Sequence, residues 1–361
     1  MKPGSILLEA RNLTKHYPVR RGLVFRREVG PVRAVDGVSL DLKRGETLAI
    51  VGESGCGKST LARLLLRLIE ATSGSVTFDG TNLQALDREA MRGMRRRMQM
   101  IFQDPYASLN PRLSIRRILI EPMALHLKLS PSELEREMLS LLNVVGLQPF
   151  HADRYPHEFS GGQRQRIGIA RALATKPDLV VCDEPVSALD VSIQAHVINL
   201  LEDLKRDFHL SYVFIAHDLA VVRHIADRIA VMYLGEIVEI GDKGDVTRAP
   251  RHPYTRALLA AVPHPEPGIR DAKPVLEGDL PSPLQQPAGC KFHPRCPFAV
   301  DRCKSERPAL RPLPGGIEAA CHRAEHLPAW QRYRAAPISA AITARQSAIA
   351  NAAKAKVAAD A

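Results

Sequence analysis

A glycine-rich stretch near the N-terminus carries the residue types that bind phosphate groups. It reads Gly52-Glu53-Ser54-Gly55-Cys56-Gly57-Lys58-Ser59-Thr60 and fits the pattern G-x-x-x-x-G-K-[ST]. Its glycines allow backbone N–H groups to turn inward around phosphates, while Lys58 reaches the β- and γ-phosphates and the Ser59 hydroxyl is placed for Mg²⁺. The sequence therefore predicts a site for a nucleoside triphosphate with magnesium.

Two further stretches end in side chains that could act on this triphosphate. The apolar run 179–182 is followed by Asp183 and Glu184, and the apolar run 212–216 is followed by His217. A P-loop enzyme needs a carboxylate that organises Mg²⁺ and a group that orients the attacking water. We expect Asp183 to bind the metal and Glu184 to polarise water. The alternatives are a solvated acidic loop and a structural histidine.

A second glycine-containing helix start follows later in the chain. An apolar helical run at 167–173 comes after the residues Ser160-Gly161-Gly162-Gln163. A helix opened by a serine and two glycines is another N-terminus suited to an anion. One triphosphate does not need two such cradles from one chain.

The elements that must position these residues alternate between strands and helices. Residues 47–51 predict a buried strand and residues 60–68 a helix, which is the context in which the glycine-rich pattern binds phosphate. Alternating strands and helices predict an α/β fold with a mainly parallel sheet, whose carboxyl edge holds ligands. Further strands are expected at 6–11 and 34–42 as an antiparallel pair around a basic loop at 19–32, and at 75–80 and 98–103. A helical subdomain is expected at about 105–165.

Together these motifs resemble the ATP-binding subunits of ABC transporters over roughly residues 8–322. The run Phe159–Arg166 resembles the ABC signature, although the family form usually begins with leucine. The resemblance implies an ABC-type P-loop core with an antiparallel β subdomain, and a head-to-tail dimer that holds two ATP molecules between P-loop and signature. The roles that it implies are adenine stacking by Tyr17, Mg²⁺ contact and subdomain linkage by Gln103, catalysis by Glu184, γ-phosphate sensing by His217, and communication across the dimer by Asp190.

Several other stretches resemble the dipeptide and oligopeptide importer branch, and specifically its second, F-type ATPase subunit. Importers of nickel and glutathione share this branch. The resemblance implies a heterodimer with a homologous ATPase, two permease subunits, an extracytoplasmic peptide-binding protein and a peripheral place on the cytoplasmic face of the inner membrane. The stretches are 102–112, 154–160, 250–259, 280–283 and 290–297.

Composition narrows the remaining alternatives. The 361 residues carry a net charge of +11 at pH 7, which favours an anionic surface of lipid or nucleic acid nearby. No apolar run approaches the roughly 20 residues that span a bilayer, and the N-terminus lacks a signal-peptide core, so we expect a soluble protein. A soluble ABC ATPase acting on nucleic acid usually has paired cassettes or long heptad arms. Since neither is seen, we expect no nucleic-acid partner.

We expect three regions along the chain. An ABC ATPase domain occupies residues 5–260, and a proline-dense C-terminal module occupies 261–330. An alanine-rich tail at 331–361 has few large apolar residues, so it is expected to be disordered or marginally helical.

Four cysteines fall within the C-terminal module with the spacing C-x5-C-x6-C-x17-C. Four thiolates are the ligand set of a [4Fe–4S] cluster and of structural zinc, while zinc usually uses more closely spaced pairs. Some members of the resembled branch carry an iron–sulfur cluster here, so we expect [4Fe–4S], with Zn²⁺ or free buried thiols as alternatives. A reducing cytosol disfavours disulfides. The residues are Cys290, Cys296, Cys303 and Cys321.

Overall fold

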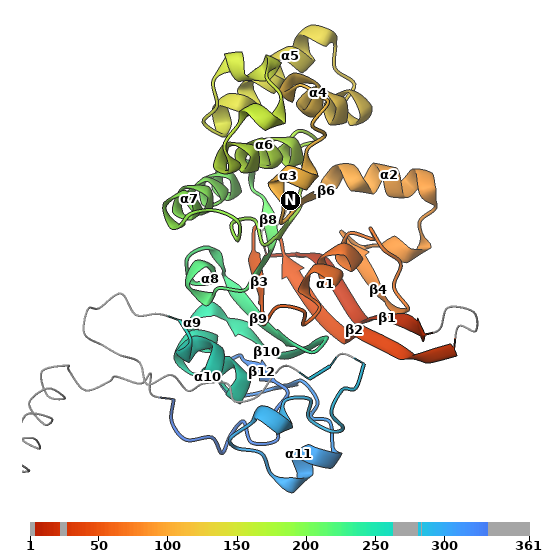
Figure 1. Cartoon of the computed structure of the whole chain (residues 1–361), viewed down its shortest axis with the longest axis vertical. Helices are drawn as coiled ribbons and strands as arrows, with labels where there is room; N and C mark the ends of the chain where they lie inside the picture. The colour runs from red at the N-terminus through yellow and green to blue at the C-terminus, as the bar shows by residue number, and fades with distance from the viewer. Residues whose placement is uncertain (1–3, 22–26, 263–280, 283, 331–361) are drawn as a thin grey trace, which may run out of the picture.

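The computed structural model describes residues 4–21, 27–262, 281–282 and 284–330. The molecule is elongated, with its β-strands between two ends (Figure 1). Helices α4 (Ile115–His126) and α5 (Pro131–Val144) form one end, and α11 (Asp301–Ser305) lies at the other. The α/β architecture expected from the sequence is confirmed.

An eight-stranded sheet carries the glycine-rich loop, in the order β11-β12-β10-β9-β3-β8-β7-β6. The five strands from β9 to β6 are parallel, and the other three pair antiparallel at one edge. Central parallel strands are covered on both faces, so their sequences are continuous apolar runs. The parallel strands are β3 (Thr47–Val51), β6 (Met98–Ile101), β7 (Leu179–Asp183), β8 (Ser211–Ala216) and β9 (Arg228–Tyr233). The antiparallel strands are β10 (Glu236–Asp242), β11 (Arg311–Pro312) and β12 (Glu318–Ala319).

A second, antiparallel sheet has the order β2-β1-β4-β5, which confirms the expected β subdomain. It contains β1 (Ile6–Arg21), β2 (Arg27–Lys43), β4 (Ser73–Phe78) and β5 (Thr81–Asn82). The loop expected at 19–32 is shorter than predicted, because β1 and β2 pair as far as Arg21 and Arg27. Ladder hydrogen bonds use main-chain groups, so a basic, glycine-containing sequence can continue a hairpin that its neighbours have started.

Helices flank the large sheet and build the region between β6 and β7. The helix after the glycine-rich loop begins at Lys58 instead of residue 60, so the loop's own lysine opens it. Helix α5 begins at Pro131 behind a capping box formed by Ser130 and Glu133. The other helices are α1 (Lys58–Leu65), α2 (Arg88–Arg97), α3 (Pro105–Ser108), α6 (Gly161–Leu173), α7 (Val191–Phe208), α8 (Leu219–Ile225), α9 (Lys243–Arg248) and α10 (Pro253–Ala260). The 3-10 turns are η1 (Leu83–Ala85), η2 (Pro149–Asp153), η3 (Pro156–Glu158) and η4 (His293–Arg295).

The C-terminal segment is joined to the core instead of standing apart from it. Strand β12 pairs with β10 and so extends the large sheet. The Phe292 ring is 2% exposed and lies against Tyr233 and Tyr254, with ring centroids 5.3 and 5.4 Å away. The start of the expected module at 261–280 is described only to residue 262, and the expected disordered tail at 331–361 lies outside the described residues.

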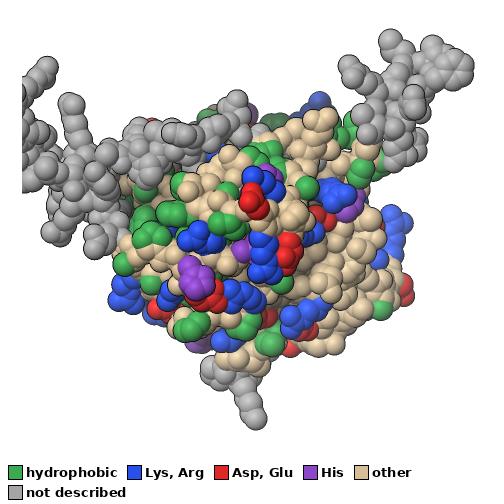
Figure 2. All heavy atoms as spheres, turned by 90° about the horizontal axis from the view of Figure 1, so that it is seen from below, with side chains coloured by type: hydrophobic (Ala, Val, Ile, Leu, Met, Phe, Trp, Pro, Cys, Tyr) green, Lys and Arg blue, Asp and Glu red, His purple; other side chains and the backbone are tan. Residues whose placement is uncertain are grey.

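The surface around α11 mixes charges of both signs. Lys and Arg side chains lie interspersed with Asp, Glu and hydrophobic side chains on this face (Figure 2). The positive net charge is therefore not gathered into one basic patch on this face. In the part of the chain that the structure describes, no helix combines the length and the apolar character needed to cross a bilayer.

Candidate nucleotide site

The glycine-rich loop joins β3 to α1 and is closely packed on neighbouring backbone. A Cβ atom at Gly52 would come within 2.2 Å of the Met232 carbonyl oxygen. At Gly57 the backbone has φ 109°, and a Cβ atom would come within 2.0 Å of the Ala34 carbonyl oxygen. Glycine is therefore required by space at Gly52, and by both conformation and space at Gly57.

Lys58 is held inside this loop and is only 4% exposed. Its Nζ donates to the carbonyl oxygens of Gly52 and Glu53, at 2.8 and 3.0 Å. The same atom lies 3.8 Å from the Glu184 carboxylate. The ammonium group is thus already turned toward the position where the sequence predicts phosphate.

Ser59 and Asp183, which the sequence predicts as oxygen ligands of Mg²⁺, contact each other. The Ser59 hydroxyl donates to Asp183 Oδ1 at 2.9 Å. Burial raises the pKa of Asp183 above its ordinary value, the Ser59 hydrogen bond lowers it, and the nearby Glu184 charge raises it further. A buried carboxylate beside a hydroxyl is a donor set that Mg²⁺ favours, so these residues fit a bound magnesium ion.

Glu184 is the point where three strand ends converge. Its carboxylate accepts a hydrogen bond from Gln103 Nε2 at 3.1 Å, and His217 Nδ1 lies 3.5 Å from the same oxygen. Its backbone is left-handed, with φ 46°, and its amide donates to the Ile215 carbonyl at 3.1 Å. A non-glycine residue held in this conformation is typical of functional sites. Gln103, Glu184 and His217 follow β6, β7 and β8 respectively, which brings them to the same edge of the sheet.

A cavity of about 240 Å³ opens over the loop. Most of the predicted phosphate-binding residues line it, together with Gln103 and Glu184, whereas Tyr17 is not among the described residues that do. Tyr17 is 40% exposed on β1 and pairs with Val32 of β2, which does line the cavity. His217 lies in a smaller adjoining cavity that also includes Glu184. The full lining is Val32, Arg33, Ala34, Ser54, Gly55, Cys56, Gly57, Lys58, Ser59, Thr60, Gln103, Glu184, Leu234, Gly235 and Gln286.

The second predicted cradle lies elsewhere. Ser160 caps α6, since its Oγ accepts from the Gln163 amide at 3.4 Å and its own amide donates to Gln163 Oε1 at 3.1 Å. Within the described chain, none of the residues from Ser160 to Gln163 lines the cavity over the glycine-rich loop, and neither does Asp190. Asp190 is exposed at the start of α7. The structure thus separates these residues from the chain's own phosphate site.

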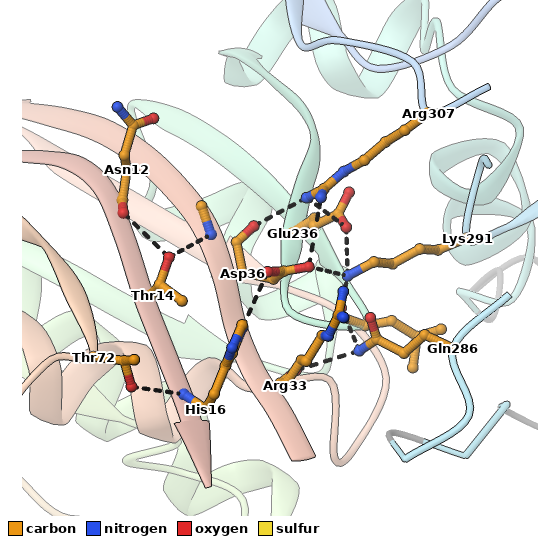
Figure 3. Close-up of polar contacts among 12 residues, drawn as sticks. Asn12, Thr14, His16, Arg33, Asp36, Thr72, Glu236, Gln286, Lys291 and Arg307 are labelled. Carbon is orange, nitrogen blue, oxygen red and sulfur yellow. Dashed lines mark hydrogen bonds and ion pairs between the residues drawn. The ribbon is translucent and has the colours of Figure 1, made fainter. Parts of the chain in front are cut away.

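A charged cluster behind the cavity was missed by sequence reasoning. Figure 3 shows Lys291 and Arg307 reaching from the C-terminal segment toward Asp36 on β2 and Glu236 on β10. Lys291 Nζ donates to Asp36 Oδ2 at 3.0 Å and also pairs with Glu236, while Arg307 lies 2.7 Å from Glu236. His16 Nε2 is 3.1 Å from Asp36. Burial alone would raise the pKa of Asp36, but Lys291, His16 and Arg307 outweigh it and hold that pKa below its ordinary value.

The four C-terminal cysteines line one small cavity, together with His252, His293 and His322. Burial raises the pKa of Cys290 to about 12 and that of Cys321 to about 11, which keeps these thiols protonated. Yet among the described residues no three His, Cys, Asp or Glu side chains are arranged to hold a metal ion. The expected [4Fe–4S] or zinc site is therefore not supported by the geometry, although sequence spacing did identify residues that fold together. Cys296 and Cys303 complete the group.

Two family models match parts of this chain. Residues 35–187 match the family model for ABC transporters, and residues 238–303 match the model for the C-terminal region of oligopeptide/dipeptide transporters. The chain is 55% identical to a probable peptide ABC transporter ATP-binding protein of Sinorhizobium fredii, covering 88% of this chain and 89% of that one. It is 52% identical to the oligopeptide transport ATP-binding protein OppF of Escherichia coli, covering 84% and 92%.

A solved structure shares the fold at lower identity. It is a dimeric ATP-binding cassette in a post-hydrolysis state, bound to ADP and Pi. Its TM-score is 0.57 at 29% identity, and the match covers 65% of this chain and 98% of that one. The similarity extends over most of the cassette and leaves part of this chain unmatched.

Proposed function

Because the chain belongs to the ABC transporter family, as an ATP-binding subunit of the oligopeptide and dipeptide importer type, we propose that it hydrolyses ATP to drive peptide uptake across the cytoplasmic membrane. The observation that carries the proposal is one cavity lined by a buried lysine, by a hydroxyl that donates to a buried carboxylate, and by a second carboxylate held by two neighbours. This arrangement suits phosphoryl transfer to water.

The residues divide the chemistry among them. Lys58 and the loop's backbone N–H groups bind the phosphates. Ser59, Asp183 and Gln103 would hold Mg²⁺, which supplies charge neutralisation on the phosphate oxygens when bound. Glu184 accepts a hydrogen bond from the attacking water and orients it, and Gln103 and His217 hold that carboxylate in place.

We infer that the functional form is a dimer with a homologous ATPase. Ser160 and its neighbours are exposed or half-buried at a helix start that does not face the chain's own described loop cavity. Such a cradle suits the ATP held by another chain, and the similar solved cassette is a dimer. Each ATP would then lie between one chain's P-loop and the other chain's signature.

A groove beside α4 suits a membrane subunit. It measures about 490 Å³ and is lined largely by apolar side chains from the segment after α1, from β6 and the segment that follows it, and from α4. Leu68, Phe102 and Leu125 are 43, 39 and 66% exposed there. Exposed apolar side chains gathered in one groove are typical of a protein interface. We propose that a cytoplasmic loop of one of two permease subunits occupies it, which places the chain on the membrane's cytoplasmic face.

Reconstitution tests the transport proposal. The chain, its ATPase partner, two permeases and the extracytoplasmic binding protein are assembled in proteoliposomes, and uptake of labelled dipeptides and longer peptides is measured with ATP. We expect uptake that disappears in the Glu184→Gln variant. If nickel or glutathione is taken up and peptides are not, the assignment of peptides as the substrate is wrong. ATPase activity that responds to nucleic acid but not to the permeases would overturn the transporter proposal.

We also propose that the four cysteines bind a [4Fe–4S] cluster when the protein is loaded. The donor set fits the group in kind, because four thiols line one cavity, although their present arrangement does not fit it in geometry. As thiolates, Cys290, Cys296, Cys303 and Cys321 would hold the cluster, which would tie the C-terminal segment together. Metal analysis and visible absorption on anaerobically purified protein test this. Roughly four irons per chain and a broad absorption band at about 400 nm would support the cluster. One zinc per chain would show a zinc site in its place, and the absence of any metal would reject the proposed site.

A further inference from the structure

The P-loop is held from outside the cassette by a residue of the C-terminal segment. Arg295 closes the 3-10 turn η4 and is 242 residues from Glu53, the second residue of the loop. Its two terminal nitrogens donate to the two Glu53 carboxylate oxygens, at 2.7 and 2.9 Å. This is the bidentate geometry in which a guanidinium fixes both the position and the orientation of a carboxylate.

The pair is sheltered from water on the arginine side. The Arg295 side chain is 5% exposed and that of Glu53 is 27% exposed. Arg295 also lies 3.5 Å from the Tyr233 hydroxyl, and its Nε is buried without a hydrogen-bond partner among the described residues. An arginine buried to this degree is restricted to few conformations, so the position of η4 fixes the position of the carboxylate.

The backbone of Glu53 is held as well. Its amide donates to the Tyr254 hydroxyl at 2.8 Å, and Tyr254 is fully buried on α10. Its carbonyl accepts from Lys58 Nζ at 3.0 Å, so the residue that Arg295 holds also positions the lysine that binds phosphate. The amide, the carbonyl and the carboxylate of Glu53 therefore all form hydrogen bonds. The partners of the amide and the carboxylate, Tyr254 and Arg295, both come after β9, the last parallel strand in the described chain.

We propose that Arg295 is a positioning residue for ATP binding, which acts through Glu53 to hold the first half of the P-loop and Lys58 in their phosphate-binding arrangement. The inference rests on the proposed ATP hydrolysis at this site. A loop that is already ordered loses less conformational entropy when ligand binds, so its affinity is higher. The Arg295–Glu53 pair stabilises the ATP complex equally before and during the chemical step. Its loss should therefore change KM and leave kcat unchanged.

A purely structural role would be to attach the C-terminal segment to the cassette. That attachment has other supports, since Lys291 and Arg307 pair with Asp36 and Glu236 (Figure 3). In addition, Phe292 lies among buried tyrosines. Loss of the Arg295 pair should consequently leave the segment in place while loosening the loop.

The test compares Arg295→Gln with Arg302→Gln in the full-length chain. Arg302 forms a similar two-nitrogen pair with Glu306 in the same segment, but on an exposed surface. Isothermal calorimetry with Mg-ATP should show an affinity about tenfold weaker for Arg295→Gln and unchanged for Arg302→Gln, within the range of about 5- to 150-fold typical of couplings between sites. In the reconstituted transporter, the KM for ATP should rise by a similar factor with kcat preserved.

A second variant covers the case in which Arg295→Gln does not fold. Glu53→Gln removes the carboxylate of the same pair from the loop side, and should weaken ATP binding to a similar extent. If Arg295 acts through Glu53, the double variant should bind ATP no more weakly than the worse single variant. Affinities of Arg295→Gln and Glu53→Gln equal to that of Arg302→Gln, or effects that add in full, would overturn the inference. A parent chain that binds no ATP would instead reject the proposed function.

Discussion

At the scale of single residues, the site concentrates its contacts on the Glu184 carboxylate. Lys58, Gln103 and His217 approach it at 3.8, 3.1 and 3.5 Å, and each comes from a different part of the chain. The left-handed backbone at Glu184 turns the side chain toward this group. The carboxylate is thus held in one orientation before ATP binds, as a residue that orients water must be.

We predict that Glu184→Gln binds ATP with unchanged affinity and hydrolyses it roughly 10²–10⁴ times more slowly, which is the range for loss of a general base. The amide keeps the shape and still contacts Gln103, but it no longer carries the charge that polarises water. Single-turnover hydrolysis and equilibrium binding by the same preparation check both halves. Turnover close to that of the parent chain would show that another group activates water.

We predict the opposite pattern for Lys58→Ala. Hydrogen bonds to charged groups are worth about 1.5–3 kcal/mol, so ATP affinity should fall by roughly 10- to 150-fold. Calorimetric titration measures this directly. Lys176→Ala is the matched control, because Lys176 is an exposed lysine paired with Glu137 on the helical end. Equal affinities for the two variants would contradict the assignment of Lys58 to the phosphates.

At the scale of elements, the start of α6 has both a local and a remote role. Ser160 and Gln163 form a reciprocal cap that satisfies two backbone donors. A Cβ atom at Gly162 would come within 2.7 Å of an Ile193 methyl group on α7, so this glycine allows the two helices to approach. The cap and the close packing fix the direction in which the helix start faces, which is what a cradle for another chain's ATP requires.

We predict that Ser160→Arg leaves ATP binding by the isolated chain unchanged and abolishes hydrolysis over the partner's P-loop in the dimer. The large side chain would fill the space that the partner-bound phosphate needs. Ser160→Ala is the comparison variant, because it removes the hydroxyl, whose cap is worth about 1 kcal/mol of helix stability, without adding the bulk of arginine. Calorimetry on the isolated chain and ATPase assays on the dimer give the two measurements. Weakened binding in the isolated chain would place Ser160 at its own site.

At the scale of the whole molecule, the two ends carry different surfaces. The helical end carries the apolar groove beside α4, and the other end carries the C-terminal segment that contacts the P-loop. The predicted ATP site is lined by residues that follow β3, β6 and β7. Gln103, in the segment that leads from β6 to the helical end, contacts Glu184 and so links that end to the site.

We predict that a cysteine placed at Ser108 crosslinks to a permease in the assembled transporter. Ser108 lines the groove, and the neighbouring Tyr106 is 61% exposed and offers a second position. Phe208→Cys is the control, since Phe208 is 44% exposed at the end of α7 and lies outside the described groove lining. The parent chain accounts for crosslinks from its native cysteines. Crosslinks from position 108 only to soluble proteins would reject the docking surface.

The sequence alone determined the chemistry of the phosphate site. Lys58 and Ser59 follow their glycines at fixed spacing, so the motif alone predicts their roles toward the phosphates and Mg²⁺. Asp183, Glu184 and His217 could be assigned to the same edge because apolar runs preceded them, and parallel strands bring their carboxyl ends together. The apolar runs at 179–182 and 212–216 therefore carried information about tertiary position.

Only the tertiary structure decided what surrounds that site. The bonds from Arg295 and Tyr254 to Glu53 span 242 and 201 residues, and the Lys291–Asp36 pair spans 255. No periodicity or motif relates residues so far apart, because their meeting depends on how β10 and β12 join the sheet. The four cysteines also show what the sequence leaves undecided. Their spacing predicted that they would gather, but whether four sulfurs converge on a metal depends on side-chain positions that the surrounding fold sets.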